Sequence, residues 1–316
     1  MKVKKGVITA AARGARLYPV ADTVQKAMLP FVDKDGVTKP VIQIIAEEAL
    51  AAGVEEICIV CAPGDEDRYL QAFHSLRENL IRAYEGIDWA EAEVAHISAL
   101  LECLSFSVQE KEGGYGDAVL CAEKFVGDEP FLLLLGDHFY HCMHGTKRCS
   151  QQLIAAADFS KGISVSAVNA TSGHLINHYG TLAGKPTGEA GLFQVERIVE
   201  KPSLSFAEVE LMTPGLRMGY FLCVFGMHIL QPDIFSILRN QAQTLTAGQE
   251  LQLTPALQVL ADKKLLLASE LKGTRFDLSD SYGLFQAQLA FGLAGQNRDE
   301  IINYVVQILG ESSRRS

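Results

Sequence analysis

The chain has 316 residues, with 28 Lys and Arg against 38 Asp and Glu, and therefore a formal net charge of −10. Hydrophobic residues make up 48% and charged residues 21%, which excludes an intrinsically disordered chain. The sequence contains no apolar run of the ~18 residues that a membrane span requires, and its acidic balance disfavours nucleic acid as a partner. Seven cysteines fit no disulfide framework and the N-terminus resembles no signal peptide, so we expect a cytoplasmic protein with no membrane partner.

The first half of the chain alternates short apolar runs with longer helical patterns, which predict strands and helices respectively. The expected strands are 6–11, 56–61, 104–108 and 131–135, and the expected helices are 40–53, 65–84 and 118–125. The run Phe-Leu-Leu-Leu-Leu at 131–135 is typical of a central parallel strand that is buried on both faces. This alternation of strands and helices indicates an α/β fold.

The second half is richer in strands. It predicts strands at 163–168, 192–199, 221–225 and 265–268, and helices at 230–239, 253–262, 281–294 and 298–309. Together the two halves predict one α/β domain over residues 5–294, with a Rossmann-like, mostly parallel mixed sheet flanked by helices. Residues 295–310 are expected to form a C-terminal helix that packs on this domain or on a partner subunit, and 311–316 a frayed tail.

Two groups of cysteine and histidine could suggest metal or redox chemistry. Cys58 and Cys61 have C-x-x-C spacing, but they lie in a run that reads as a buried strand. Residues 138–144 contain three histidines and a cysteine, yet their spacing matches no standard zinc pattern. We interpret this second segment as a loop with incidental histidines.

Ligands of open α/β sheets bind at the carboxyl ends of the strands, and residues 10–30 follow the first of these ends. Small residues there would let backbone N–H groups approach phosphates, while Arg16 and Lys26 would supply positive charge. The alternative interpretation is ordinary turn chemistry, because small residues after a strand are common.

Two later strand ends also carry charged residues. Asp137 follows the buried strand 131–135 and is a candidate Mg²⁺ ligand; the alternative is a cap for the following loop. Lys201 emerges from the strand 192–199 beside Glu200, and the alternative is a solvated surface pair.

Several stretches match one family in order along the chain. Residues 10–30 align without a gap with its leading motif, Ala-Ala-Gly-x-Gly-Thr-Arg-x-x-Pro followed by Pro-Lys-Glu-Met-Leu-Pro. The glycine motif at 114–120, preceded by Gln109, reads Gly-Tyr-Gly-Asp-Ala-Val-Leu where the family has Gly-Leu-Gly-His-Ala-Val-Leu. The further matching stretches are 126–131 with 135–137, 179–180, 199–202, 250–254 and 275–277. The chain thereby resembles the sugar-1-phosphate nucleotidyltransferases, and within them the bacterial UTP–glucose-1-phosphate uridylyltransferases (UDP-glucose pyrophosphorylases).

This resemblance implies a fold of the nucleotide-diphospho-sugar transferase type and a homo-oligomer. It also implies that an oxygen of a sugar-1-phosphate attacks the α-phosphorus of a nucleoside triphosphate and releases pyrophosphate. One anion attacks another, so the site must supply cations and close placement. The implied substrates are UTP and glucose-1-phosphate, which give UDP-glucose, and the implied cofactor is Mg²⁺.

The resemblance also assigns roles to individual residues. The residues implied in catalysis are Arg16 and Lys26 at the triphosphate, Asp137 as a Mg²⁺ ligand and Lys201 at the sugar phosphate, with Asp277 as a second metal ligand. The implied nucleotide contacts are Ala11, Ala12, Gly14, Gln109 and Gly114. Gln109 suits a pyrimidine edge because an amide both donates and accepts hydrogen bonds. The implied sugar contacts are Tyr179, Gly180 and Glu200.

The chain departs from the family pattern at the site itself. The departures are Ala12 for Gly, Ala15 for Thr, Asp22 for Lys, Ala27 for Glu, Asp117 for His, His138 for Asp and Ser279 for Gly, with an insertion at 33–39. Two hypotheses follow: an enzyme that uses UTP, or alternatively dTTP or another sugar-1-phosphate, and a weakly active regulatory paralogue that binds sugar nucleotides. The retained cations and Asp137 favour the enzyme.

Overall fold

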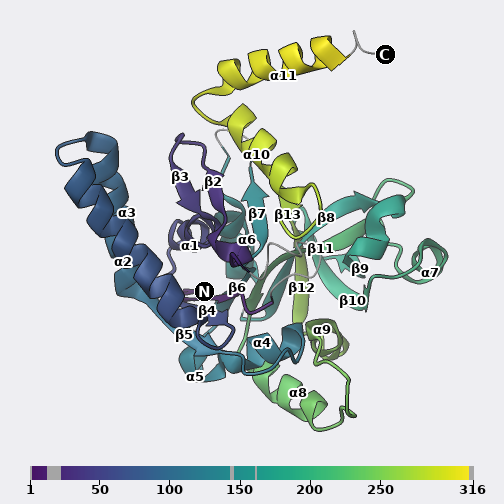
Figure 1. The fold of residues 1–316 in the computed structure, drawn as a ribbon. Helices are drawn as coiled ribbons and strands as arrows, with labels where there is room; N and C mark the ends of the chain where they lie inside the picture. The colour runs from purple at the N-terminus through teal and green to yellow at the C-terminus, as the bar shows by residue number, and fades with distance from the viewer. Residues whose placement is uncertain (1, 13–22, 143–145, 161, 313–316) are drawn as a thin grey trace.

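The computed structural model describes residues 2–12, 23–142, 146–160 and 162–312 (Figure 1). Within these residues nine strands form one sheet, in the order β5-β4-β1-β6-β11-β8-β12-β10-β9. Their bounds are β1 (Lys5–Thr9), β4 (Glu56–Cys61), β5 (Leu104–Val108), β6 (Phe131–Leu135), β8 (Ser164–Ser172), β9 (Gly180–Pro186), β10 (Leu192–Glu200), β11 (Tyr220–Leu230) and β12 (Leu266–Glu270). Two short pairs stand beside it, β2 (Pro30–Val32) with β3 (Thr38–Pro40), and β7 (His138–His141) with β13 (Thr274–Asp277).

The sheet is parallel in its first half and mainly antiparallel in its second. Strands β5, β4, β1 and β6 are parallel neighbours, joined by helical crossovers. Strand β11 then runs antiparallel to both β6 and β8, and β10 runs antiparallel to both β12 and β9; β8 and β12 are parallel. The expectation of a mostly parallel sheet is therefore wrong for the second half. The antiparallel pairing of β9 and β10 has a local cause. Only a short turn separates these strands, and a parallel pair would need a longer crossover connection.

Helices cover both faces of the sheet, as the alternation of side chains along its central strands requires. On β1, Ile8 belongs to the core on one face and Val7 to the core on the other. The first face is covered by α1 (Val41–Leu50), α2 (Asp65–Ala83), α3 (Asp88–Cys103), α6 (Cys149–Phe159) and α10 (Gly283–Ala294). The second is covered by α4 (Tyr115–Cys121), α5 (Glu123–Val126), α8 (Asp233–Ala242) and α9 (Leu253–Asp262).

The remaining elements lie at the margins of this body. Helices α2 and α3 form a long hairpin beyond β5, and α7 (Leu204–Glu210) lies beside β9 and β10 at the opposite side (Figure 1). Two 3₁₀ helices, Lys26–Met28 and Gly173–His178, complete the described elements. None of the described helices is long and apolar enough to cross a membrane.

The C-terminal helix α11 (Arg298–Ser312) projects from the body and contacts α10, where Ile301 faces Gly292 (Figure 1). Four of its apolar side chains are more than half exposed, namely Tyr304, Val306, Ile308 and Leu309. The domain limits proposed from the sequence, 5–294, 295–310 and 311–316, remain a prediction, and so does the packing of this helix on a partner subunit.

The histidine-rich segment expected to be a loop is partly a strand. Residues 138–141 form β7, which pairs antiparallel with β13 so that His138 lies opposite Asp277. The sequence did not predict β7 because its pairing partner lies more than 130 residues away in the chain. The pairing places Asp277 beside His138, just beyond the end of β6.

Candidate active site

A cavity of about 700 Å³ opens at the carboxyl ends of β1 and β6. These strands are parallel neighbours in register, with Thr9 opposite Leu135, so the loops that follow them leave the sheet side by side. The cavity is lined by Thr9, Ala10, Ala11, Ala12, Gln25, Lys26, Ala27, Asp65, Tyr69, Gln109, Glu112, Gly114, Tyr115, Ala118, Leu135, Gly136, Asp137, Glu250 and Gln252. Its position agrees with the rule that open α/β sheets bind ligands beyond the carboxyl ends of their strands.

Small residues allow the two strand ends to meet. The Gly136 N–H donates to the Thr9 carbonyl at 2.9 Å. A Cβ atom at Gly136 would lie 2.8 Å from the Cβ atom of Ala10, which is closer than side chains pack. Glycine at this position therefore lets Asp137 approach the loop that follows β1.

Lys26 and Asp137 form an ion pair on the cavity wall. The Lys26 Nζ lies 2.6 Å from Asp137 Oδ2, and their side chains are only 9% and 19% exposed. His138 Nδ1 lies 2.9 Å from the other carboxylate oxygen, Oδ1. Burial would raise the pKa of the Asp137 carboxyl, but the His138 hydrogen bond and the Lys26 charge outweigh it and hold the pKa well below its ordinary value. Asp137 is thus an anion whose two oxygens already face donors.

Asp137, His138 and Asp277 each offer a ligand atom, and these atoms all lie within 4.8 Å of one another. We call these three residues the metal cluster, after the ligand atoms that they offer. The Ser279 N–H donates to Asp277 Oδ1 at 2.9 Å, which fixes that carboxylate. Two carboxylates are the hard oxygen donors that Mg²⁺ prefers, so this donor set fits the ion. His138, where the family pattern has a second Asp, orients Asp137 through its ring nitrogen.

The loop before α4 is held to the segment before α9. The Gly116 N–H donates to the Leu251 carbonyl at 2.7 Å. Gly114 has a φ of +99°, and a Cβ atom there would lie 2.6 Å from the Leu251 oxygen. Only glycine fits this approach, so two motifs more than 130 residues apart form one wall of the cavity.

Gln109 is also held by this loop. Its amide Nε2 donates to the Gly114 carbonyl at 3.1 Å and to Asp117 Oδ2 at 2.7 Å. Asp117 stands where the family pattern has His, so this departure binds the Gln109 amide. The amide donors are occupied within the protein.

The residues assigned to the sugar gather at the paired ends of β9 and β10. Gly180 lies opposite Glu200, and a Cβ atom at Gly180 would stand 3.1 Å from the Glu200 carboxylate. Thr254 Oγ1 donates to that carboxylate at 2.8 Å, and the Lys201 N–H donates to the Tyr179 carbonyl at 3.1 Å. Tyr179, Gly180, Glu200 and Lys201 therefore form one group, which we call the β9–β10 group.

Lys201 differs from Lys26 in its surroundings. Its side chain is 54% exposed, and its Nζ lies 3.8 Å from Glu200 Oε1. Its backbone has a φ of +47°, a left-handed conformation that costs energy for a residue with a side chain. Such strain is compatible with a functional constraint on where the lysine points.

The structure thus brings together part of the predicted site. Of the residues expected from the sequence, those on the cavity wall are Ala11, Ala12, Lys26, Gln109, Gly114 and Asp137. The β9–β10 group is joined to the metal cluster through β13, where the Arg275 guanidinium stacks 3.6 Å from the centre of the Tyr179 ring and Asp277 ends the strand. Gly14 and Arg16 lie outside the described residues, and their assignment remains a prediction.

The cavity also exposes groups that the sequence did not indicate. Tyr69 and Asp65 come from the start of α2, where nothing in the pattern distinguishes them from other helix residues. Tyr115 lies inside the glycine motif, where the matched family pattern has Leu. That mismatch was the available signal.

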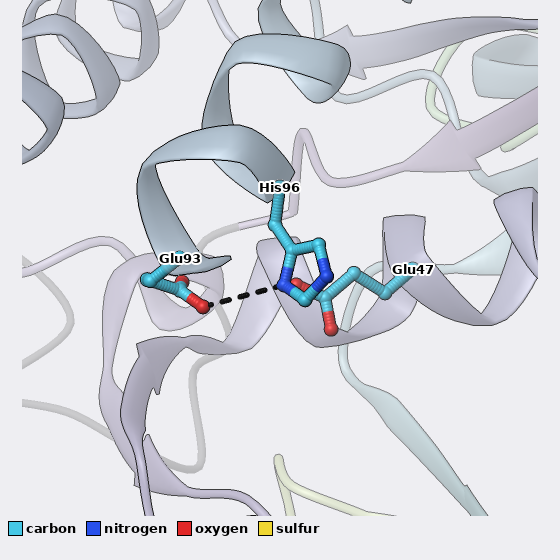
Figure 2. Close-up of side chains that lie close together, drawn as sticks. All are labelled: Glu47, Glu93 and His96. Carbon is cyan, nitrogen blue, oxygen red and sulfur yellow. Dashed lines mark ion pairs between the residues drawn. The ribbon is translucent and has the colours of Figure 1, made fainter. Parts of the chain in front are cut away.

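A second group of side chains that could ligate a metal lies between α1 and α3. Glu47, Glu93 and His96 also offer ligand atoms within 4.8 Å of one another, and Figure 2 shows the His96 ring directed from α3 toward Glu47. None of the three lines the 700 Å³ cavity. The ammonium of Lys39, which is 2% exposed, lies 3.1 Å from Glu47 and 4.0 Å from Glu93.

Comparison with known proteins agrees with this geometry. The family model described as "Nucleotidyl transferase" matches residues 5–288. The chain belongs to the nucleotidyl transferase family. The match begins at β1 and ends within α10, so it includes the cavity, the metal cluster and the β9–β10 group.

Individual members of the family match over nearly the whole chain. UTP–glucose-1-phosphate uridylyltransferase 2 of Streptococcus pyogenes serotype M3 is 33% identical over 316 residues, covering 97% of this chain and 96% of its own. A UDP-glucose pyrophosphorylase solved with UDP-glucose has a TM-score of 0.72 at 29% identity, over 92% of this chain and 98% of its own. A UTP-bound enzyme of the same type from Acinetobacter baumannii has a TM-score of 0.75 at 25% identity, over 96% and 99%. These nucleotidyl transferases share the whole fold.

Proposed function

We propose that this nucleotidyltransferase transfers a uridylyl group from UTP to glucose-1-phosphate, giving UDP-glucose and pyrophosphate. A phosphate oxygen of glucose-1-phosphate forms a bond to the α-phosphorus of UTP, and the bond between the α- and β-phosphates breaks. The observation that carries the proposal is the partly buried Lys26–Asp137 pair on the cavity wall, at the junction of two parallel strands.

The phosphate end of the site follows from that pair. An ammonium that is 9% exposed keeps its position and forms stronger interactions than one in water. When a triphosphate enters, the Lys26 Nζ can turn from Asp137 to a phosphate oxygen, which leaves Asp137 Oδ2 available to a cation. Asp137 and Asp277 would hold Mg²⁺, whose charge would offset the repulsion between the two phosphate groups.

Base selection depends on Gln109 and the loop at Gly114. Because the amide donors of Gln109 are bonded to Gly114 and Asp117, its carbonyl oxygen is the group suited to a base. An acceptor there suits the N3–H of uracil or thymine. We therefore expect UTP to be preferred, with dTTP as its main competitor.

The sugar end is assigned to the β9–β10 group. Glu200, fixed by Thr254, is an acceptor for sugar hydroxyls, and Lys201 provides the cation for the sugar phosphate. The choice of glucose-1-phosphate and UTP is supported by the relatives, which include a UTP–glucose-1-phosphate uridylyltransferase and a UTP-bound enzyme of that type.

Pyrophosphate release tests the proposal. Purified protein with Mg²⁺ is given glucose-1-phosphate and, in turn, UTP, dTTP, CTP, ATP and GTP; galactose-1-phosphate is then compared with glucose-1-phosphate. We expect the highest kcat/KM with UTP and glucose-1-phosphate. A preference for ATP or GTP would contradict the base assignment, and no release with any pair would favour the regulatory paralogue.

A further inference from the structure

Among the described residues, three buried polar atoms on the cavity wall have no hydrogen-bond partner. They are Gln25 Nε2, Tyr69 Oη and Tyr115 Oη. A buried polar group without a partner costs free energy, and native structures contain few of them. Their concentration around one cavity indicates that this wall is built for a polar ligand.

The position of Tyr115 is fixed by its neighbours. It begins α4 between Gly114 and Gly116, and at both glycines an added Cβ atom would lie within 3 Å of the Leu251 carbonyl oxygen. The loop therefore cannot shift easily, and the phenol is held in place by the same contacts that build the cavity wall.

The charged neighbours of the Tyr115 hydroxyl are two carboxylates. Burial raises the pKa of this phenol far above its ordinary value, and the negative charges of Asp137 and Glu200 raise it further. The hydroxyl therefore keeps its proton and is available as a donor. Asp137 lies on the same cavity wall as Tyr115, and Glu200 belongs to the β9–β10 group, so these two charges mark the side of the cavity assigned to the sugar phosphate.

We propose that the Tyr115 hydroxyl donates a hydrogen bond to the sugar-1-phosphate, between Asp137 and Glu200, and so positions it for attack. The inference rests on the proposed function and adds a substrate contact that the family pattern, with Leu at this position, does not supply. It also explains why the chain tolerates an unpaired buried hydroxyl. The cost in the unliganded protein is recovered when the substrate accepts the bond.

Tyr115→Phe tests this proposal because it removes the hydroxyl and keeps the ring. We expect the KM for glucose-1-phosphate to rise about tenfold, as for the loss of one hydrogen bond to a charged group. The KM for UTP should remain close to that of the wild type. The melting temperature of the unliganded protein should be unchanged or higher, because an unpaired buried group is removed.

Tyr140→Phe is the matched control. The Tyr140 hydroxyl is also buried, but it donates to the Gly226 carbonyl at 2.8 Å. Its removal leaves that carbonyl unpaired, so this variant should melt at a lower temperature and keep the wild-type ratio of the two KM values. Tyr115→Phe should thus change substrate use without lowering the melting temperature, whereas Tyr140→Phe should lower the melting temperature without changing substrate use.

Calorimetric binding of UDP-glucose and UMP separates this inference from the proposed function, because UMP lacks the phosphate that glucose-1-phosphate contributes. We expect Tyr115→Phe to weaken UDP-glucose binding and to leave UMP binding unchanged. If this difference is found but the wild type shows no turnover, the inference stands and the proposed function is overturned. The inference is wrong if Tyr115→Phe binds UDP-glucose like the wild type, weakens UMP binding equally, or melts at a lower temperature than the wild type. If Tyr115→Phe does not fold, the same comparison is made with Tyr115→Leu, and failure of both variants to fold would assign the phenol a structural role and overturn the inference.

Discussion

Two side-chain clusters in this protein offer the same types of metal ligand but differ in what surrounds them. Asp137, His138 and Asp277 stand at the cavity, where Lys26 is the cation paired with Asp137. Glu47, Glu93 and His96 stand between two helices (Figure 2). They lie away from that cavity and beside the buried ammonium of Lys39.

The difference lies in how the cation is held. Lys39 Nζ lies 3.2 Å from Asp33, 2.9 Å from Asp35 and 3.1 Å from Glu47. The Lys39 side chain is 2% exposed, and its three short contacts occupy the three hydrogens of the ammonium. Within the described residues Lys26 has one such contact, to Asp137, and it lines a cavity large enough for a substrate. Ligand type alone therefore does not identify a functional site; the neighbouring cation and the adjoining space do.

The largest effect should follow from Asp137→Asn. This substitution removes the anionic ligand and keeps the shape, so we expect turnover at saturating Mg²⁺ to fall about 10³-fold, while the protein remains folded. Pyrophosphate release and thermal melting measure the two quantities. An unchanged rate would show that Asp137 holds no catalytic metal.

At the second cluster, removal of the cation should lower the stability of the protein. Lys39→Met leaves a group of carboxylates, among them the buried Glu93, without the ammonium that compensates them. We expect the free energy of unfolding to fall by about 3 kcal/mol or more, because breaking a buried ion pair strands its partners. Turnover per folded molecule should not change. Equal stability of Lys39→Met and the wild type in urea would refute the structural role.

Substitutions of the two lysines of the candidate site should change different kinetic constants. Lys26→Ala should lower turnover on the order of 10²-fold, since it removes a preorganised charge in a partly dry site. Lys201→Ala should instead raise the KM for glucose-1-phosphate more than that for UTP. Steady-state kinetics with each substrate varied separately provides the measurement. Wild-type behaviour of Lys201→Ala toward both substrates would make Lys201 a surface residue, and the regulatory paralogue would gain support.

The smallest effect is a pH dependence of the second cluster. Burial lowers the pKa of Lys39, but Glu47, Asp35 and Asp33 outweigh it and raise the pKa above its ordinary value of 10.5. The folded state then keeps a proton that the unfolded state loses above that pH. The stability from Lys39 is complete below 10.5 and should decline above it by about 1.4 kcal/mol per pH unit.

Urea unfolding of the wild type and Lys39→Met at rising alkaline pH checks this sign. The gap between their free energies of unfolding should stay constant up to the ordinary lysine pKa and narrow beyond it. A gap that widens with pH would show that the ammonium is not held by these carboxylates.

The sequence predicted the elements whose pattern is local. Strands 56–61, 104–108 and 131–135 were predicted with the bounds that the structure has, because they are short apolar or alternating runs. Helix α3 was not predicted: its inward-facing positions include Glu93, and a buried carboxylate interrupts the apolar period on which such a prediction depends. Strand β13 was missed because it is a four-residue strand whose polar residues form no apolar pattern.

The candidate site could be predicted only in part for a similar reason. The family resemblance singled out Lys26, Asp137 and Asp277, but no periodicity places residues 111 positions apart within one ion pair. Tyr115 was visible only as a mismatch, since its loop is held by a distant segment, where the Gly116 N–H donates to the Leu251 carbonyl. The Glu47–Glu93–His96 cluster had no signal in the sequence, because it joins two helices across a gap of more than 40 residues.

Binding of Mn²⁺ in the presence of UTP, followed by electron paramagnetic resonance, tests most directly the claim that, of the two clusters in the described residues, the one at the cavity binds the metal. Mn²⁺ accepts the same oxygen ligands as Mg²⁺ and reports its own coordination. The wild type, Asp137→Asn and Glu93→Gln are compared at equal metal and nucleotide. We predict that Asp137→Asn loses the protein-bound signal and that Glu93→Gln keeps it. Loss of the signal in Glu93→Gln with retention in Asp137→Asn would contradict the account.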